Sequence, residues 1–106
     1  MIEAISPSEL RDKLQDEQLL LLDVREADEY VRCHIEGSVH IPLSEISHQL
    51  NDLVGTKQIA IICHHGIRSM QVAQLLADTG RYDKIFNLSG GIDAWASEID
   101  PEMPRY

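Results

Sequence analysis

One short segment of the sequence combines a nucleophile with groups that can stabilise an anion. Cys63 directly follows the apolar run 59–62. The residues after it are His64, His65, Gly66, Ile67, Arg68 and Ser69. Glycine lets such a loop curl, because it reaches positive φ without a Cβ clash. Successive backbone N–H groups in a curl form a nest for an anion, and the positive end of a following helix adds to it. The segment therefore predicts a reactive thiolate.

The side chains of this loop indicate how charge is supplied. Arg68 adds a fixed positive charge and a planar fork suited to oxyanions, and Ser69 is expected to cap the following helix. A single cysteine after an apolar strand is usually a small buried hydrophobe. The glycine, arginine and serine that follow Cys63 favour the reactive interpretation instead. His64 and His65 either add positive charge or are exposed loop residues without a role.

The elements that must position this loop alternate between strand and helix. Strands are expected at 2–5, 19–24, 39–41, 59–62 and 85–88, and the apolar runs at 19–24 and 59–62 predict that these two strands are buried. Helices are expected after the capping box Ser6–Glu9, at 26–31, at 69–79, and after Gly90 and Gly91 around Trp95. A further helix, capped by Ser44, carries Ile46, Leu50 and Leu53 and ends at Gly55.

This order predicts an α/β fold with a central, mainly parallel sheet of about five strands and helices on both faces. In open sheets of this kind ligands bind outside the carboxyl ends of the strands, where Cys63 falls. The length predicts one domain, 1–106, with an irregular tail from about residue 98.

Composition excludes several classes of protein. The chain has 9 Lys and Arg against 18 Asp and Glu, a formal net charge of −9. Nucleic acids and anionic membranes need a clustered basic face, so neither is an expected partner. A hydrophobic share of 43% and a charged share of 25% argue against disorder.

Location follows from the termini and the cysteines. The acidic start shows no secretory signal, and the longest aliphatic run, Leu19–Leu22, is far too short to span a bilayer. Two cysteines, Cys33 and Cys63, give no disulfide framework. We expect a cytoplasmic protein with reduced thiols.

A metal site is not expected, although several side chains of suitable type are present. The possible ligands are Cys33, His34, Cys63, His64 and His65. Adjacent histidines on a tight loop rarely converge on one ion, and no zinc spacing is present.

Three separated motifs resemble those of rhodanese-like sulfurtransferases. The pattern Cys-x-x-Gly-x-Arg-Ser resembles the active-site loop of that family. Residues 23–26, 29–30 and 34–43 look like its upstream signature, and residues 88–95 are similar to its downstream one. The resemblance extends from about Ile5 to Trp95. The ending Pro104-Arg105-Tyr106 looks like that of rhodanese domains fused to adenylating, sulfur-carrier-activating enzymes.

The resemblance implies a sulfurtransferase of the thiosulfate:cyanide type. The Cys63 thiolate would attack the outer sulfur of thiosulfate or of a persulfide donor. Cyanide, a small thiol or a protein thiol would then take the sulfur from a Cys63 persulfide. Residues His64 to Ser69 would cradle the substrate, and no cofactor is implied.

Two other classes use similar parts. The cell-cycle dual-specificity phosphatases and related arsenate reductases place arginine six positions after cysteine, whereas Arg68 follows Cys63 by five. The smaller ring favours sulfur over a phosphoryl group. Non-catalytic rhodanese-like binding modules commonly lack the cysteine. A sulfur relay to one protein partner stays open.

Two departures from the family pattern bear on these expectations. Cys33 stands where the family usually has glycine, and His40 where it often has asparagine. Cys33 is either a buried small residue or a second thiol in a disulfide or persulfide relay. Asp23 and Arg25 are expected to be structural, joining a strand end to a loop.

Overall fold

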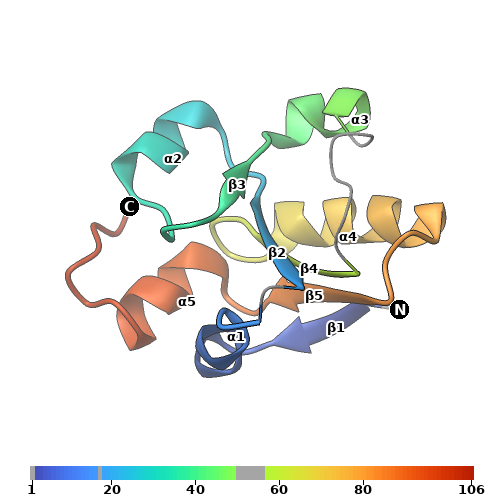
Figure 1. The fold of residues 1–106 in the computed structure, drawn as a ribbon. Coiled ribbons are helices and arrows are strands. Elements are labelled where there is room, and N and C mark those ends of the chain that lie inside the picture. The colour runs from blue at the N-terminus through green and yellow to red at the C-terminus, as the bar shows by residue number, and fades with distance from the viewer. Residues whose placement is uncertain (1, 17, 50–56) are drawn as a thin grey trace.

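The computed structural model describes residues 2–16, 18–49 and 57–106. Its centre is a five-stranded sheet in the order β1-β5-β4-β2-β3, and every neighbouring pair is parallel. The strands are β1 (Ile2–Ile5), β2 (Leu19–Asp23), β3 (Val39–His40), β4 (Gln58–Ile62) and β5 (Lys84–Leu88). The expected α/β fold is confirmed, and Figure 1 shows the arrangement.

Helices cover both faces of the sheet (Figure 1). They are α1 (Pro7–Lys13), α2 (Ala27–Arg32), α3 (Ile46–Gln49), α4 (Ile67–Thr79) and α5 (Gly91–Glu98). α1 and α5 pack on one face through Leu10, Ile92 and Trp95. α3 and α4 pack on the other face, where Ile46 and Leu76 belong to the core.

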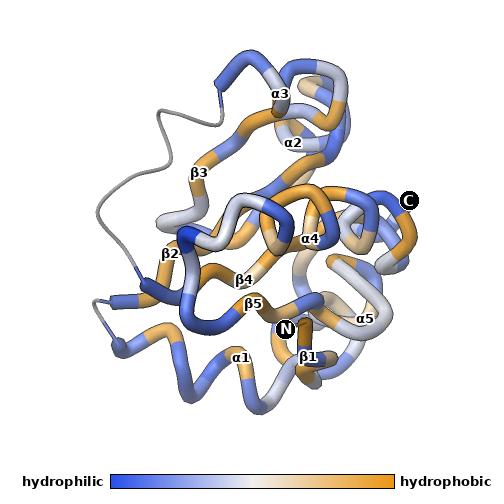
Figure 2. Tube along the Cα trace, turned by 90° about the vertical axis from the view of Figure 1, so that its right-hand side faces the viewer, coloured by the Kyte–Doolittle hydropathy of each residue, from blue (hydrophilic) through white to orange (hydrophobic). Residues whose placement is uncertain are grey.

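The central strand β4 explains why two layers of helix are needed. Ile59 and Ile61 belong to one core cluster, whereas Ala60 and Ile62 belong to the other. Side chains alternate along a strand, so an unbroken apolar run must be buried on both faces. Figure 2 shows the hydrophobic stretches along β2, β4 and β5.

Local signals set the helix boundaries. The capping box before α1 is formed: the backbone N–H of Glu9 donates to Ser6 Oγ at 3.2 Å, and that of Ser6 donates to the Glu9 carboxylate at 3.0 Å. α2 begins after Glu26, whose backbone N–H donates to the Glu29 carboxylate at 2.9 Å. The first turn of α2 therefore also holds Glu29 in place.

The expected cap at Ser44 is wrong. A 3₁₀ turn, Leu43–Glu45, begins directly after Pro42 and includes Ser44. The Glu45 N–H donates to the Pro42 carbonyl at 2.8 Å, so the chain turns before Ser44. α3 follows at Ile46, and Leu50, Leu53 and Gly55 lie outside the described residues.

Beyond Glu98 the chain forms neither helix nor strand, as expected for the tail, but it lies against the body of the protein. Met103 and Tyr106 pack against the core cluster below α5. Within the described residues, no helix has the length and apolar character needed to cross a membrane.

Candidate active site

The segment 63–66 lies at the carboxyl edge of the sheet, between β4 and α4. Asp23 pairs with Ile62 in the parallel register, so the ends of β2 and β4 meet at this edge. Cys63 is 1% exposed, directly above the last residue of β4. The loop that follows is short because α4 already begins at Ile67.

Two groups of the loop contact the Cys63 sulfur. The Gly66 N–H donates to Sγ at 3.0 Å, and Ser69 Oγ lies 3.3 Å from Sγ. Gly66 has φ +106°, the left-handed region in which only glycine is relaxed. This turn directs its N–H at the sulfur, in the manner of an anion nest.

Ser69 does not cap the helix, contrary to expectation. α4 begins two residues earlier because the left-handed Gly66 already supplies the turn into it. Ser69 therefore lies inside the first turn of α4, fully buried, with its hydroxyl beside Cys63. Its hydroxyl therefore contacts the Cys63 sulfur and does not cap a backbone N–H of the helix.

Asn87 is a residue of the site that the sequence analysis missed. Its Oδ1 accepts a hydrogen bond from Ser69 Oγ, and its Nδ2 donates to the Gly66 carbonyl at 3.2 Å. Asn87 is 6% exposed and lies between the buried, apolar Phe86 and Leu88 of β5. A polar residue in such a run was the available signal, because buried amides need partners.

The start of α5 holds the other side of the loop. The N–H of Ile92 donates to the Cys63 carbonyl at 2.8 Å, and that of Asp93 donates to the His64 carbonyl at 3.2 Å. A Cβ at Gly91 would overlap both carbonyl oxygens, and Gly91 has φ +62°. This close approach requires glycine.

Arg68 is paired with Glu29 of α2. Its Nη1 and Nη2 donate to the two carboxylate oxygens at 2.6 and 2.8 Å. The guanidinium lowers the pKa of Glu29 to about 2. The same pairing raises the pKa of Arg68, and the nearby Cys63 acts in the same direction. The expected positive charge of Arg68 is present, but the Glu29 carboxylate already accepts hydrogen bonds from both Nη atoms of the guanidinium.

Asp23 and Arg25 form a second ion pair beneath the first. Both side chains are fully buried, and Nη2 lies 2.7 Å from Asp23 Oδ2. Arg25 also donates to the Cys33 carbonyl at 2.6 Å and to the Glu29 carbonyl at 3.3 Å. Arg25 thus ties the end of β2 to the middle and the C-terminal end of α2, a structural role.

Tyr106 is the second residue that the sequence analysis missed, since it lies in the tail. Its hydroxyl donates to Glu29 Oε2 at 2.9 Å and accepts from Arg25 Nη1 at 2.8 Å. Burial raises the pKa of Tyr106 to about 12, so the hydroxyl stays a donor at neutral pH. Sequence separation of 77 residues from Glu29 left no local signal for this contact.

The two histidines of the loop lie in different surroundings. The half-buried His64 ring stacks between His65 and Tyr106, with both centroid distances 4.0 Å. Burial lowers the pKa of His64, and the neighbouring His65 lowers it further. His65 and Ile67 are exposed, and the exposed fraction of Ile67 is 74%.

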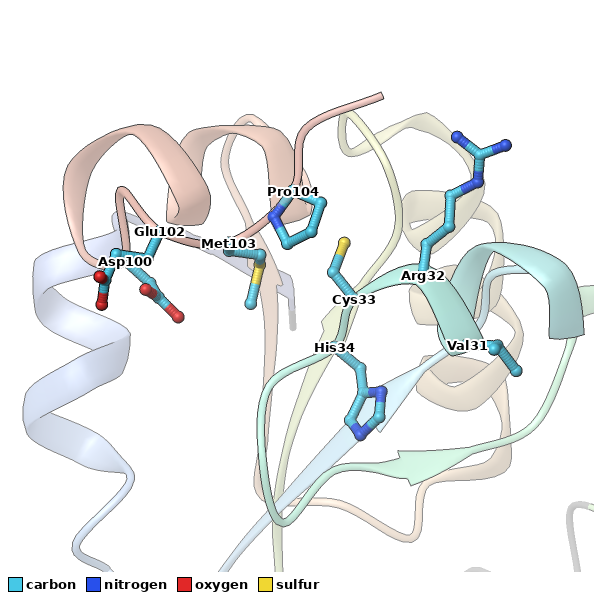
Figure 3. Close-up of a pocket in the computed structure, with 8 residues that line it drawn as sticks. All are labelled: Val31, Arg32, Cys33, His34, Asp100, Glu102, Met103 and Pro104. Atoms are coloured by element: carbon cyan, nitrogen blue, oxygen red, sulfur yellow. The ribbon is translucent and has the colours of Figure 1, made fainter.

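The second cysteine lies away from this loop, in a pocket of about 410 Å³. Figure 3 shows the Cys33 side chain directed into the space between α2 and the segment 100–104. Arg25 Nη1 lies 3.9 Å from its sulfur. Both cysteines are free. No three His, Cys, Asp or Glu side chains in the described parts of the chain are placed to hold a metal ion.

Comparison with known proteins agrees with this geometry. The model of the rhodanese-like domain family matches residues 6–98. "Putative sulfurtransferase YtwF" of Bacillus subtilis is 37% identical over 102 residues, covering 95% of this chain and 97% of that protein. "Putative sulfur carrier protein YrkF" of the same organism is 41% identical over 85 residues, covering 80% of this chain but only 45% of that protein.

A solved structure of a related protein has the same fold. A rhodanese-related protein from Thermoplasma volcanium has a TM-score of 0.82 at 31% identity, covering 92% of this chain and 93% of that chain. Fold and site together define an α/β domain with a cysteine loop at the carboxyl edge of its sheet. The chain belongs to the rhodanese-like domain family, which includes sulfurtransferases and sulfur carriers.

Proposed function

We propose that this protein is a sulfurtransferase that moves sulfane sulfur from thiosulfate or a persulfide donor to a thiophilic acceptor through a persulfide on Cys63. The observation that carries the proposal is the position of the Cys63 sulfur, 3.0 Å from the Gly66 N–H. An N–H group aimed at sulfur favours a thiolate, which is the nucleophilic form of cysteine.

The reaction has two displacements. In the first, the Cys63 thiolate bonds to the outer sulfur of thiosulfate while the sulfur–sulfur bond breaks, and sulfite leaves with the electron pair. In the second, an acceptor such as cyanide attacks the terminal sulfur of the persulfide and leaves as thiocyanate. The thiolate is restored, so no external oxidant or reductant is consumed.

The loop residues divide the work of binding. Gly66, Ile67, Arg68 and Ser69 supply backbone N–H groups at the start of α4, where the helix dipole favours a negatively charged terminal sulfur. The Ser69 hydroxyl, 3.3 Å from Sγ, can donate to the thiolate. His64 and His65 form the rim, and at neutral pH His64 is an uncharged part of it because its pKa is lowered.

A sulfur relay to a dedicated protein acceptor is the second candidate. Ile67 is 74% exposed beside the recessed Cys63, and an apolar side chain at the rim suits contact with a protein surface. The sulfur chemistry at Cys63 is the same in both cases.

We place the reaction in the cytoplasm, where thiols stay reduced, because both cysteines are free.

The phosphatase alternative makes a different demand on the loop. A phosphoryl group needs a ring of N–H groups large enough for a tetrahedral anion, and here α4 begins only four residues after Cys63. We expect no Cys63-dependent hydrolysis of aryl phosphates. Clear hydrolysis of that kind would overturn the proposal.

Intact-protein mass spectrometry tests the function directly. After exposure to thiosulfate, the protein should gain one sulfur atom, and cyanide should remove it. Cys63→Ser should neither gain sulfur nor turn over, because a hydroxyl cannot carry a persulfide. Cys33→Ser is the matched control and should keep most activity. Turnover in Cys63→Ser would refute the assignment, and a complete loss in Cys33→Ser would support a two-thiol relay.

A further inference from the structure

The positive charge of Arg68 is already paired with the Glu29 carboxylate, so it is not free to attract an anion. We infer that Glu29 determines donor specificity by selecting against dianionic donors, so that the preferred donors are alkyl persulfides of low charge. This inference rests on the proposed sulfur transfer. It adds the class of donor and the residue that sets it.

The geometry of the pair explains why a donor does not easily displace Glu29. Two parallel N–H···O bonds of 2.6 and 2.8 Å join Arg68 to both carboxylate oxygens. The side chains are only 31% and 16% exposed, respectively. A bidentate, sheltered pair is stronger than an exposed one, since water competes less for either partner.

Two further donors hold the Glu29 carboxylate in place. The Glu26 N–H donates to Oε1 and the Tyr106 hydroxyl donates to Oε2, each at 2.9 Å. Arg25 in turn donates to the Tyr106 oxygen at 2.8 Å. With the Arg68 bonds, Glu29 accepts four hydrogen bonds, so it cannot swing away without leaving several donors unsatisfied.

The charges at the site therefore cancel. Arg68 is neutralised by Glu29, and Arg25 beneath it is neutralised by Asp23. The lowered pKa of His64 removes a further positive charge from the rim at neutral pH. The whole chain carries a net charge of −9. A dianion such as thiosulfate meets no net attraction here, whereas a persulfide of single charge is repelled less.

The size of the effect follows from Coulomb's law. Because the Coulomb energy scales with the charge of the donor, one unit charge near the site, in the screened surroundings of a protein surface, changes the binding constant of a dianion by about tenfold more than that of a monoanion. Removing the Glu29 charge should therefore raise kcat/KM for thiosulfate by about tenfold relative to a singly charged persulfide.

The test compares two donors on matched variants. The donors are thiosulfate and the persulfide of 2-mercaptoethanol, generated in situ, and the readout is kcat/KM for each. Glu29→Gln should raise the ratio of thiosulfate to persulfide use by about tenfold. Asp28→Asn removes the same charge from an exposed position one residue earlier and should change the ratio by less than about twofold.

A second pair of variants keeps the test decisive if Glu29→Gln folds poorly. Tyr106→Phe keeps the ring on His64 but removes the hydroxyl from Glu29, so it should shift the same ratio part of the way in the same direction. Arg68→Ala leaves Glu29 unpaired and should lower thiosulfate use more than persulfide use, and Glu29→Gln in that background should restore part of the loss.

The outcomes separate the inference from the proposed function. Equal changes in kcat/KM for both donors in Glu29→Gln would mean that Glu29 only shapes the loop, and would overturn the inference while leaving sulfur transfer intact. Failure of both donors to load sulfur on Cys63 of the unmodified protein would overturn the proposed function itself.

Discussion

The Ser69 hydroxyl lies 3.3 Å from the Cys63 sulfur and at the same time donates a hydrogen bond to Asn87. One hydroxyl thus joins the sulfur to the neighbouring strand β5. Its proton is held by Asn87 in this structure and can turn to the sulfur when Cys63 becomes a thiolate or a persulfide. Ser69 is inside the first turn of α4, so its position is fixed by the helix.

Ser69→Ala should therefore slow the reaction without unfolding the protein. A hydrogen bond to a charged group is worth about 1.5–3 kcal/mol, which corresponds to roughly a ten- to hundredfold loss in kcat. The rate of Cys63 alkylation at neutral pH should fall in parallel. Ser97→Ala, on the exposed side of α5, is the control and should change neither rate. Unchanged alkylation in Ser69→Ala would exclude a role for the hydroxyl at the sulfur.

Gly91→Ala should disrupt the loop through its backbone. A Cβ at this position overlaps the carbonyl oxygens of Cys63 and His64, and the residue has φ +62°. We expect a loss of about 2 kcal/mol or more in the free energy of unfolding, and little remaining sulfur transfer. Urea unfolding and activity assays measure the two effects.

Gly37→Ala is the matched control for that variant. Gly37 also has positive φ, at +88°, but a Cβ there would meet no described atom within 4 Å. It should cost about 1 kcal/mol and leave activity in place. If both alanine variants lose activity alike, the close approach at Gly91 is not what the loop requires.

Arg25→Leu should be strongly destabilising. It removes the partner of the fully buried Asp23 and strips hydrogen bonds from the Cys33 carbonyl and the Tyr106 hydroxyl. Leaving one charge of a buried pair uncompensated costs about 3–5 kcal/mol. Arg11→Leu, which breaks an exposed pair with Asp12, should change the free energy of unfolding by less than about 0.5 kcal/mol. Similar values for the two variants would contradict the structural role of Arg25.

The Glu29–Arg68 pair should contribute stability only above acidic pH. Arg68 lowers the pKa of Glu29 to about 2 from an ordinary value of 4.5. A lowered pKa means that the folded protein binds fewer protons than the unfolded chain, so the contribution is complete above pH 4.5 and is lost as the pH falls toward 2. Since the pair is partly exposed, the contribution is about 1 kcal/mol.

Urea unfolding at several pH values checks this dependence. The difference in the free energy of unfolding between the unmodified protein and Glu29→Gln should be constant from pH 7 to pH 5 and should shrink between pH 4.5 and pH 2. A difference that persists at the lowest pH would mean that the carboxylate charge is not what stabilises the contact.

The fold and the position of the proposed nucleophile, Cys63, follow from local patterns of the sequence. The apolar run of β4 is buried on both faces, which requires helices above and below it. That run ends at Ile62, so Cys63 must lie at the carboxyl edge of a parallel sheet. Gly66 predicted the curl of the loop because only glycine is relaxed at its φ of +106°.

The first residues of two helical segments were predicted wrongly, because two residues near each start could turn the chain. Ser44 and Ser69 both have the residue type of a cap, yet Pro42 and Gly66 turn the chain earlier. The short strand β3 ends at His40, and Ile41 is buried beyond it. At both helix starts the backbone conformation of a proline or a glycine decided the boundary.

Only the tertiary structure decided what surrounds Cys63. Asn87 reaches Gly66 across 21 residues of sequence, Arg68 reaches Glu29 across 39, and Tyr106 reaches Glu29 across 77. No periodicity or spacing encodes such pairs, because they arise from the packing of separate elements at one edge of the sheet. The sequence by itself determined that Cys63 lies at the carboxyl edge of the sheet, at the start of a loop that curls at Gly66; the packing of α2 and the tail decided that the Arg68 guanidinium is paired with Glu29.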